Sequence, residues 1–276
     1  MRNDGGVASD YWAPDDVAFR TPSVARMYDY FLGGSHNFPI DRQAAEAIKR
    51  VYADFPLLLH ANRAFLRRAV DFLAARGVQQ FLDLGSGIPT VGNVHEIAER
   101  AAPESRVVYV DIDPIAVAHS ELLLRGNPRA TVIQADVRQP EVILHHREVQ
   151  RLLNFDRPLA VLLVALLHFV TDDEEAYALV RQLREALPSG SYLVISHASS
   201  EGMPAEQNVQ LERLYGQTSN PVKTRSRQEI ARFFDGLELV EPGVVFFPLW
   251  HPESPDDLFL QQPSRSSGYA GVGRKQ

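Results

Sequence analysis

The sequence predicts an α/β protein built on a doubly wound, mostly parallel β-sheet, and three observations lead to this class. From residue 78 onward, short β-rich apolar runs alternate with stretches of helical length, which is the order that parallel βαβ units produce. Residues 160–164 are apolar at every position, as expected of a central strand that is covered on both faces. A chain of 276 residues, 45% hydrophobic and 23% charged, can bury such a core without cross-links.

Before residue 78 the pattern predicts helices only. Three helices are expected, over residues 23–32, 41–52 and 57–76. The first ends at Gly33-Gly34, a strong helix breaker, and the third ends at Gly77. We therefore expect residues 1–77 to form an N-terminal helical cap region above a second domain, residues 78–276.

The second domain is expected to contain a seven-stranded sheet. Strands are expected over residues 80–84, 106–111, 130–134, 159–164, 191–196, 237–240 and 269–272. Helices are expected over residues 90–101, 114–124, 140–152, 173–187 and 227–234. Residues 201–225 are polar, contain Gly and Pro, and are expected to form an insertion with one helix. The apolar residues 244–250 suit either packing on the sheet or a subunit interface, so monomer and homodimer both stay open.

Composition excludes several classes of protein. Without cysteine, the chain has no disulfide scaffold, thiolate metal site or cysteine nucleophile. The net charge of −7 argues against a broad nucleic-acid or anionic-membrane surface. The longest uncharged run, residues 158–171, is shorter than the about 20 apolar residues that a bilayer requires, and residues 1–16 lack an apolar targeting segment. We expect a cytoplasmic protein without a membrane or nucleic-acid partner.

A glycine-rich turn, Asp83-Leu84-Gly85-Ser86-Gly87, follows the first expected strand. Such a turn is where open α/β sheets bind nucleotides. The dinucleotide fingerprint requires another glycine at residue 90, where this chain has Thr90, so close approach of a pyrophosphate to a helix N-terminus is poorly supported. An NAD-dependent oxidoreductase is therefore the less favoured alternative.

Acidic side chains stand at the ends of three successive strands: Asp83, Asp111 and Asp136. Because the carboxyl ends of parallel strands meet at one edge, this edge should carry negative charge, which repels phosphate and suits a cationic nucleoside. S-adenosylmethionine carries a sulfonium and an ammonium and no phosphate. Asp111 can hold its ribose hydroxyls, and Asp136 with the backbone of Val137 can bind the adenine. Each Asp taken alone is as readily a turn former or a helix cap.

These segments resemble a known class of enzyme. Residues 83–87, 110–114 and 134–137 are similar to the successive cofactor motifs of class I S-adenosylmethionine-dependent methyltransferases. Residues 25–38 and 62–70 narrow the resemblance to one bacterial family of S-adenosyl methyltransferases, and the match covers roughly residues 21–274. Pro89 departs from the class, because many members have a third glycine there.

The resemblance implies a Rossmann-like fold and a set of cofactor contacts. The methionine part would lie on Asp83, Gly85, Ser86 and Gly87, the ribose on Asp111, and the adenine on Ile112, Asp136 and Val137, with Ala165 bordering the methyl group. Asp113 is assigned to the same cofactor-binding set, although its place before Pro114 also makes it the clearest helix cap.

Four further candidates carry an ordinary structural alternative. His168 follows the central strand and is the candidate general base, with a near-neutral pKa, unless it is a loop histidine bonded to the backbone. Tyr28 closes over the site or only packs its helix, and Gly34 lets the backbone approach the ligand or only ends the helix. Arg63 either forms an ion pair with the carboxylate of the cofactor or is a solvated helix residue. No histidines show metal-ligand spacing, so no metal is expected.

Together these observations predict a methyltransferase acting on an unknown, small-molecule acceptor by direct in-line transfer, with S-adenosylhomocysteine as product. Alignment of donor and acceptor would supply most of the catalysis. Because His168 is also explained as a structural loop residue, the second alternative is a protein that binds S-adenosylmethionine as a sensor or partner subunit without transferring methyl.

Overall fold

The computed structural model describes residues 20–89 and 92–276 and contains one eight-stranded sheet in the order β3-β2-β1-β4-β5-β8-β6, with β7 beside β8. The strands are β1 (Gln80–Leu84), β2 (Arg106–Asp111), β3 (Ala130–Gln134), β4 (Ala160–Val164), β5 (Tyr192–Ala198), β6 (Glu238–Leu239), β7 (Val245–Phe246) and β8 (Gly268–Arg274). The first five strands pair in parallel, and β8 pairs antiparallel with β5, β6 and β7.

Ten α-helices are described. They are α1 (Val24–Phe31), α2 (Pro39–Val51), α3 (Phe55–Ala74), α4 (Val94–Ala101), α5 (Pro114–Leu123), α6 (Pro140–Leu144), α7 (Arg147–Leu152), α8 (Asp173–Ala186), α9 (Ala205–Tyr215) and α10 (Arg227–Ala231). Short 3₁₀ turns are η2 (Leu167–Phe169), η3 (Arg232–Phe234), η4 (Phe247–Leu249) and η5 (Pro263–Ser266). Among the described residues, no helix is both long and apolar enough to cross a bilayer.

The predicted fold class is confirmed, with two local differences. The sheet has eight strands instead of seven, because part of the apolar stretch 244–250 forms β7 against β8 and then turns into η4. The helix expected over 140–152 is two helices, since the His146 side chain accepts a hydrogen bond from Glu148 N and caps α7. Residues 1–19 lie outside the described residues. So does Thr90, on which the comparison with the dinucleotide-binding fingerprint depended.

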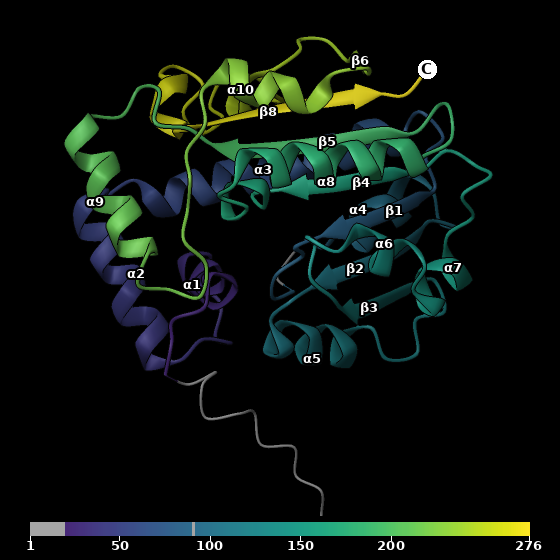
Figure 1. Ribbon diagram of the computed structural model, residues 1–276, viewed down its shortest axis with the longest axis horizontal. Helices are drawn as coiled ribbons and strands as arrows, with labels where there is room; N and C mark the ends of the chain where they lie inside the picture. The colour runs from purple at the N-terminus through teal and green to yellow at the C-terminus, as the bar shows by residue number, and fades with distance from the viewer. Residues whose placement is uncertain (1–19, 90–91) are drawn as a thin grey trace, which may run out of the picture.

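Both faces of the sheet are covered by helices, as the alternation along β1 requires. Leu82 and Leu84 face a core that includes α6, α7 and α8, whereas Phe81 faces one that includes α3, α4 and α5. The parallel strands point toward the side of the molecule on which α1, α2 and α9 lie (Figure 1). Because β1 pairs with both β2 and β4, the order of strands reverses there, and ligands bind at such a switch point.

A third apolar cluster joins the N-terminal helices to the insertion. Met27 of α1 and Ile48 of α2 pack with Leu211 of α9, and Ser219 N donates to Pro22 O at 2.9 Å. Helix α3 belongs to two clusters: its start, with Leu59, packs in this third cluster, and Phe65 onward packs against the sheet. The division at residue 77 stays a prediction.

A buried carboxylate, Asp41, anchors the N-terminal helices. It is 0% exposed and accepts from Ser23 N at 2.9 Å, Arg26 Nε at 2.8 Å and Phe38 N at 2.8 Å. Arg26 also reaches Asp113 at 3.2 Å, at the start of α5. The Asp41–Arg26 pair therefore joins α1 to α2, and the Arg26–Asp113 pair attaches them to the segment between β2 and α5.

Asp41→Asn is expected to lower the free energy of unfolding by about 3 kcal/mol, because it leaves part of the buried Arg26 charge uncompensated. Asp71→Asn is the control: Asp71 forms two long surface ion pairs, at 3.9 and 3.8 Å, worth less than about 1 kcal/mol. Urea unfolding at pH 7 measures both. Equal, small losses in the two variants would contradict the anchoring role.

Candidate functional site

A cavity of about 640 Å³ opens at the carboxyl edge of the sheet, between the strand ends and helices α1, α3 and α9. This volume is in the range of small-molecule sites. The cavity brings together all but one of the predicted site residues: Tyr28, Arg63, Asp83, Gly85, Ser86, Gly87, Asp111, Ile112, Asp113, Asp136, Val137, Ala165 and His168.

Gly34 is the exception, because it is not in the cavity lining. A Cβ at this position would overlap the carboxylate of Asp29, and Gly34 N donates to Asp29 O at 2.8 Å. The missing side chain therefore makes room for a buried Asp within the cap, and an approach of ligand to Gly34 is not supported by its position.

The glycine turn after β1 has a backbone that only glycine adopts readily. Gly85 and Gly87 both have φ of +68°, in the left-handed region. A Cβ on Gly85 would lie 2.5 Å from Leu166. Gly85 N and Ser86 N both donate to Val110 O, at 2.8 and 3.1 Å, so the turn folds back onto the end of β2.

Asp111 closes this turn from the second strand. Its carboxylate accepts from Gly87 N at 2.7 Å and from Asp113 N at 2.8 Å, which leaves further acceptor capacity for a ligand. Burial raises the pKa of Asp111 to about 6, although the two backbone hydrogen bonds oppose the shift. The side chain is thus a buried acid that a cation or hydroxyl donors would stabilise.

Asp83 lies deeper, at 6% exposure. Burial raises the pKa of its carboxyl to about 7, the nearby Arg63 partly offsets this, and the charge of Asp111 adds to it. Arg63 itself donates to Gly92 O at 2.9 Å. A positive group placed in the cavity would lower the pKa of both acids and hold them ionised.

The third acid is already paired in the cavity wall. Asp136 accepts from Arg138 Nε at 2.9 Å, and this contact lowers its pKa. Ile112 is 47% exposed and lies in the cavity lining, so its side chain is accessible to a ligand there. Asp113 caps α5 by accepting from Ile115 N at 2.8 Å, and it also accepts from Ser23. It is therefore both a helix cap and a residue of the cavity lining.

His168 differs from the expected near-neutral base. It lies in η2, is 9% exposed, and its Nδ1 accepts from Ala198 N at 3.4 Å. Burial, reinforced by the charge of Arg225, lowers its pKa to about 3. The ring is therefore neutral at physiological pH, and its proton is on Nε2, because Nδ1 faces a donor.

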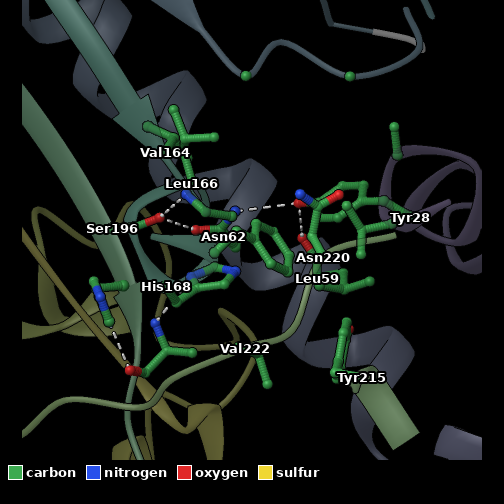
Figure 2. A pocket seen from close by; sticks show the side chains of 18 of the residues that line it. Tyr28, Leu59, Asn62, Val164, Leu166, His168, Ser196, Tyr215, Asn220 and Val222 are labelled. Atoms are coloured by element: carbon green, nitrogen blue, oxygen red, sulfur yellow. Dashed lines mark hydrogen bonds between the residues drawn. The ribbon is translucent and has the colours of Figure 1, made fainter. Parts of the chain in front are cut away.

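Sequence reasoning missed a polar chain that crosses the cavity floor. Ser196 Oγ donates to Asn62 Oδ1 at 2.6 Å, Asn62 Nδ2 donates to the Tyr28 hydroxyl at 3.1 Å, and Ala165 N donates to Ser196 Oγ at 2.9 Å. Figure 2 shows these side chains in one line across the pocket. Asn62 and Ser196 are 134 positions apart, so no local pattern announces their contact.

One buried polar atom of the cavity wall is placed to bond a polar ligand. Ser86 Oγ is buried in the cavity wall without a hydrogen-bond partner in the part of the chain that the structure describes, and such atoms normally have one. Over the same residues, no group of three or more metal-binding side chains is found. The acids, the glycine turn and Ser86 together fit the methionine and ribose of S-adenosylmethionine.

The fold and this cavity define a class I S-adenosylmethionine-dependent methyltransferase, with acidic strand ends around a glycine turn at the switch point of the sheet. The chain belongs to the S-adenosyl methyltransferase family, whose model matches residues 10–276. The resemblance drawn from its motifs is confirmed.

Two solved structures are similar to nearly the whole chain. A candidate methyltransferase from Thermobifida fusca YX is 42% identical, with a TM-score of 0.89, and the match covers 96% of this chain and 99% of that one. A DUF574 family protein from Streptomyces avermitilis MA-4680 is 41% identical, also with a TM-score of 0.89, over 94% of this chain and 100% of that one.

A curated relative is more distant. The demethylspheroidene O-methyltransferase of Cereibacter sphaeroides is 24% identical over 259 residues, or 91% of this chain. The chain spans 61% of the length of that relative.

Asp83→Asn is expected to stabilise the ligand-free protein at alkaline pH. The pKa of Asp83 is about 7 when folded against 3.8 for an ordinary Asp, so the folded state holds its proton longer and stability falls as pH rises from about 4 to 7. The variant has no carboxyl here to ionise and does not lose stability in this way. Its free energy of unfolding relative to that of wild type should therefore increase by about 2–3 kcal/mol from pH 5 to pH 8. Urea unfolding at both values measures it, with exposed Asp156→Asn as control. A variant less stable than wild type at pH 8 would contradict the assignment.

Proposed function

We propose that this protein binds S-adenosylmethionine at the acidic strand ends and transfers its methyl group directly to a small-molecule acceptor held in the same cavity. The observation that carries the proposal is the composition of that cavity. One part is lined by the glycine turn and four aspartates, and the other by apolar side chains of α1, α3 and α9. A donor site and an acceptor site are thereby placed next to each other.

Different residues would bind different parts of the cofactor. Asp83, with its raised pKa, would take the ammonium, and Ser86 the carboxylate or a polar atom beside it. Asp111 would accept from the ribose hydroxyls, and the exposed Ile112 would cover one face of the adenine. Arg63, beside Asp83, would balance the carboxylate of the methionine part.

When bound, S-adenosylmethionine supplies a methyl group already activated by the sulfonium. The protein then has to hold the acceptor in line and keep water away, which are alignment and desolvation effects. Ala165 and Leu166, which directly follow β4, also line the cavity. His168 orients a group through Nε2–H instead of removing a proton, because its neutral ring already accepts from Ala198.

The weak basicity of His168 also favours the second candidate, a cofactor-binding protein that transfers no methyl. Incubation with S-adenosylmethionine labelled in the methyl group and a small-molecule extract distinguishes the two. We expect label to enter a low-molecular-weight product with wild type and, at subsaturating cofactor, to enter it more slowly with Asp111→Ala. Cofactor binding without any labelled product would support the non-transferring protein.

Asp111→Ala is expected to weaken S-adenosylhomocysteine binding by about 1–3 kcal/mol, since charged hydrogen bonds to the ribose are lost. Isothermal titration calorimetry measures the change. Glu104→Ala, which removes an exposed acid before the opposite end of β2, should bind like wild type. Unchanged affinity in Asp111→Ala would show that the ribose lies elsewhere.

A further inference from the structure

The cavity continues beyond the strand ends into a space that we call the apolar chamber, lined by Tyr28, Leu59, Phe169, Leu211, Tyr215 and Val222. These residues come from α1, α3, η2, α9 and the segment after α9. Figure 2 shows Leu59, Tyr215 and Val222 around the same space as His168. Most of this lining comes from the cap and the insertion, and not from the sheet.

Charge is nearly absent from this chamber. The three arginines of the described lining belong to the acidic side: Arg26 pairs with Asp113, Arg63 lies near Asp83, and Arg138 pairs with Asp136. In the part of the chain that the structure describes, this leaves Glu212 as the charged side chain on the chamber side. Its carboxylate accepts from Asn208 at 3.0 Å and Thr224 at 3.2 Å.

The two tyrosines of the chamber and the adjacent His168 are held neutral. Burial raises the pKa of Tyr28 and of Tyr215, and burial lowers that of His168. The charge of Arg63 acts on Tyr28, but Arg63 donates to Gly92 O and lies near Asp83 on the acidic side. Among the described residues, the chamber therefore has no cationic side chain of its own. A carboxylate or phosphate would therefore be buried without a counter-charge, which is strongly unfavourable.

A second polar group of the lining is the pair formed by the Tyr28 hydroxyl and the Asn62 amide. The Tyr28 hydroxyl donates to Leu59 O at 3.3 Å and accepts from Asn62 at 3.1 Å. This leaves a lone pair on Tyr28 and the second amide hydrogen of Asn62 without a partner among the described residues. A hydroxyl group, which both donates and accepts, matches that pair.

We propose that the methyl acceptor is an uncharged, predominantly apolar molecule bearing a hydroxyl group, bound in the apolar chamber with that hydroxyl on the Tyr28–Asn62 pair. This inference rests on the proposed function, because it assigns the acceptor for the cofactor site described above.

The first test compares three ligands with one ring system and different charge. 2-Naphthol, 2-naphthoate and 2-naphthylmethylammonium are titrated into the full chain saturated with S-adenosylhomocysteine, at pH 7.5. We expect 2-naphthol to bind at least about tenfold more tightly than either ion, a difference of about 1.4 kcal/mol. Equal or tighter binding of 2-naphthoate or of the ammonium would overturn the proposal, as would the absence of 2-naphthol binding.

The second test places a charge inside the chamber. Val222 is part of the lining, whereas Val209 on α9 is 63% exposed, so Val222→Lys and Val209→Lys form a matched pair in the insertion. Val222→Lys should shift the preference between 2-naphthol and 2-naphthoate at least about tenfold toward the anion, while Val209→Lys leaves it unchanged. An unaltered preference in Val222→Lys would overturn the proposal, and damage to the fold alone would not strengthen naphthoate binding.

The control titration separates this inference from the proposed function. S-adenosylhomocysteine should bind Val222→Lys and wild type alike. If it binds neither, the proposed function fails. The three naphthalene ligands are then titrated into the unliganded chain, where the same order of affinities still decides which class of molecule the chamber takes.

Discussion

The carboxylate of Asp111 is the contact around which the site is organised. It accepts from Gly87 N and Asp113 N, so one side chain holds both the glycine turn after β1 and the start of α5. Because β1 and β2 are neighbours in the sheet, the contact joins adjacent strand ends at the switch point. Asp113, placed in this way, caps α5 and receives Arg26 from the cap. The cap is thus attached to the sheet through carboxylates as well as apolar packing.

Two kinds of buried acid share this small region and differ in their partners. Asp41 is fully buried, and its carboxylate is matched by Arg26 and by two backbone N–H groups. Asp83 is buried almost as deeply, yet its ionisation is opposed, and its pKa rises to about 7. The first arrangement stabilises the fold. The second lowers stability in the empty protein and favours a positive ligand, as sites built for binding often do.

The sequence predicted the sheet and its acidic edge because both are local: apolar runs set the strands, and Asp83 stands at the end of one. It could not predict the Asn62–Ser196 contact, which depends on how α3 lies across β5. Gly34 carried a glycine signal whose cause, the buried Asp29 beside it, is visible only in three dimensions. The two-residue β7 was missed because it lies within the continuous apolar run 244–250, which shows no alternation between two faces.

The helix of the insertion packs mainly against the N-terminal helices. Leu211 of α9 lies in the cluster that includes Met27 and Ile48, and Gln207 Nε2 donates to Val51 O at 2.7 Å. The segments that enclose the far end of the cavity are thus largely separate from the strand ends that line its other end. Substitutions at a few positions of the insertion can therefore change which molecules enter the chamber, while the residues at the strand ends stay the same.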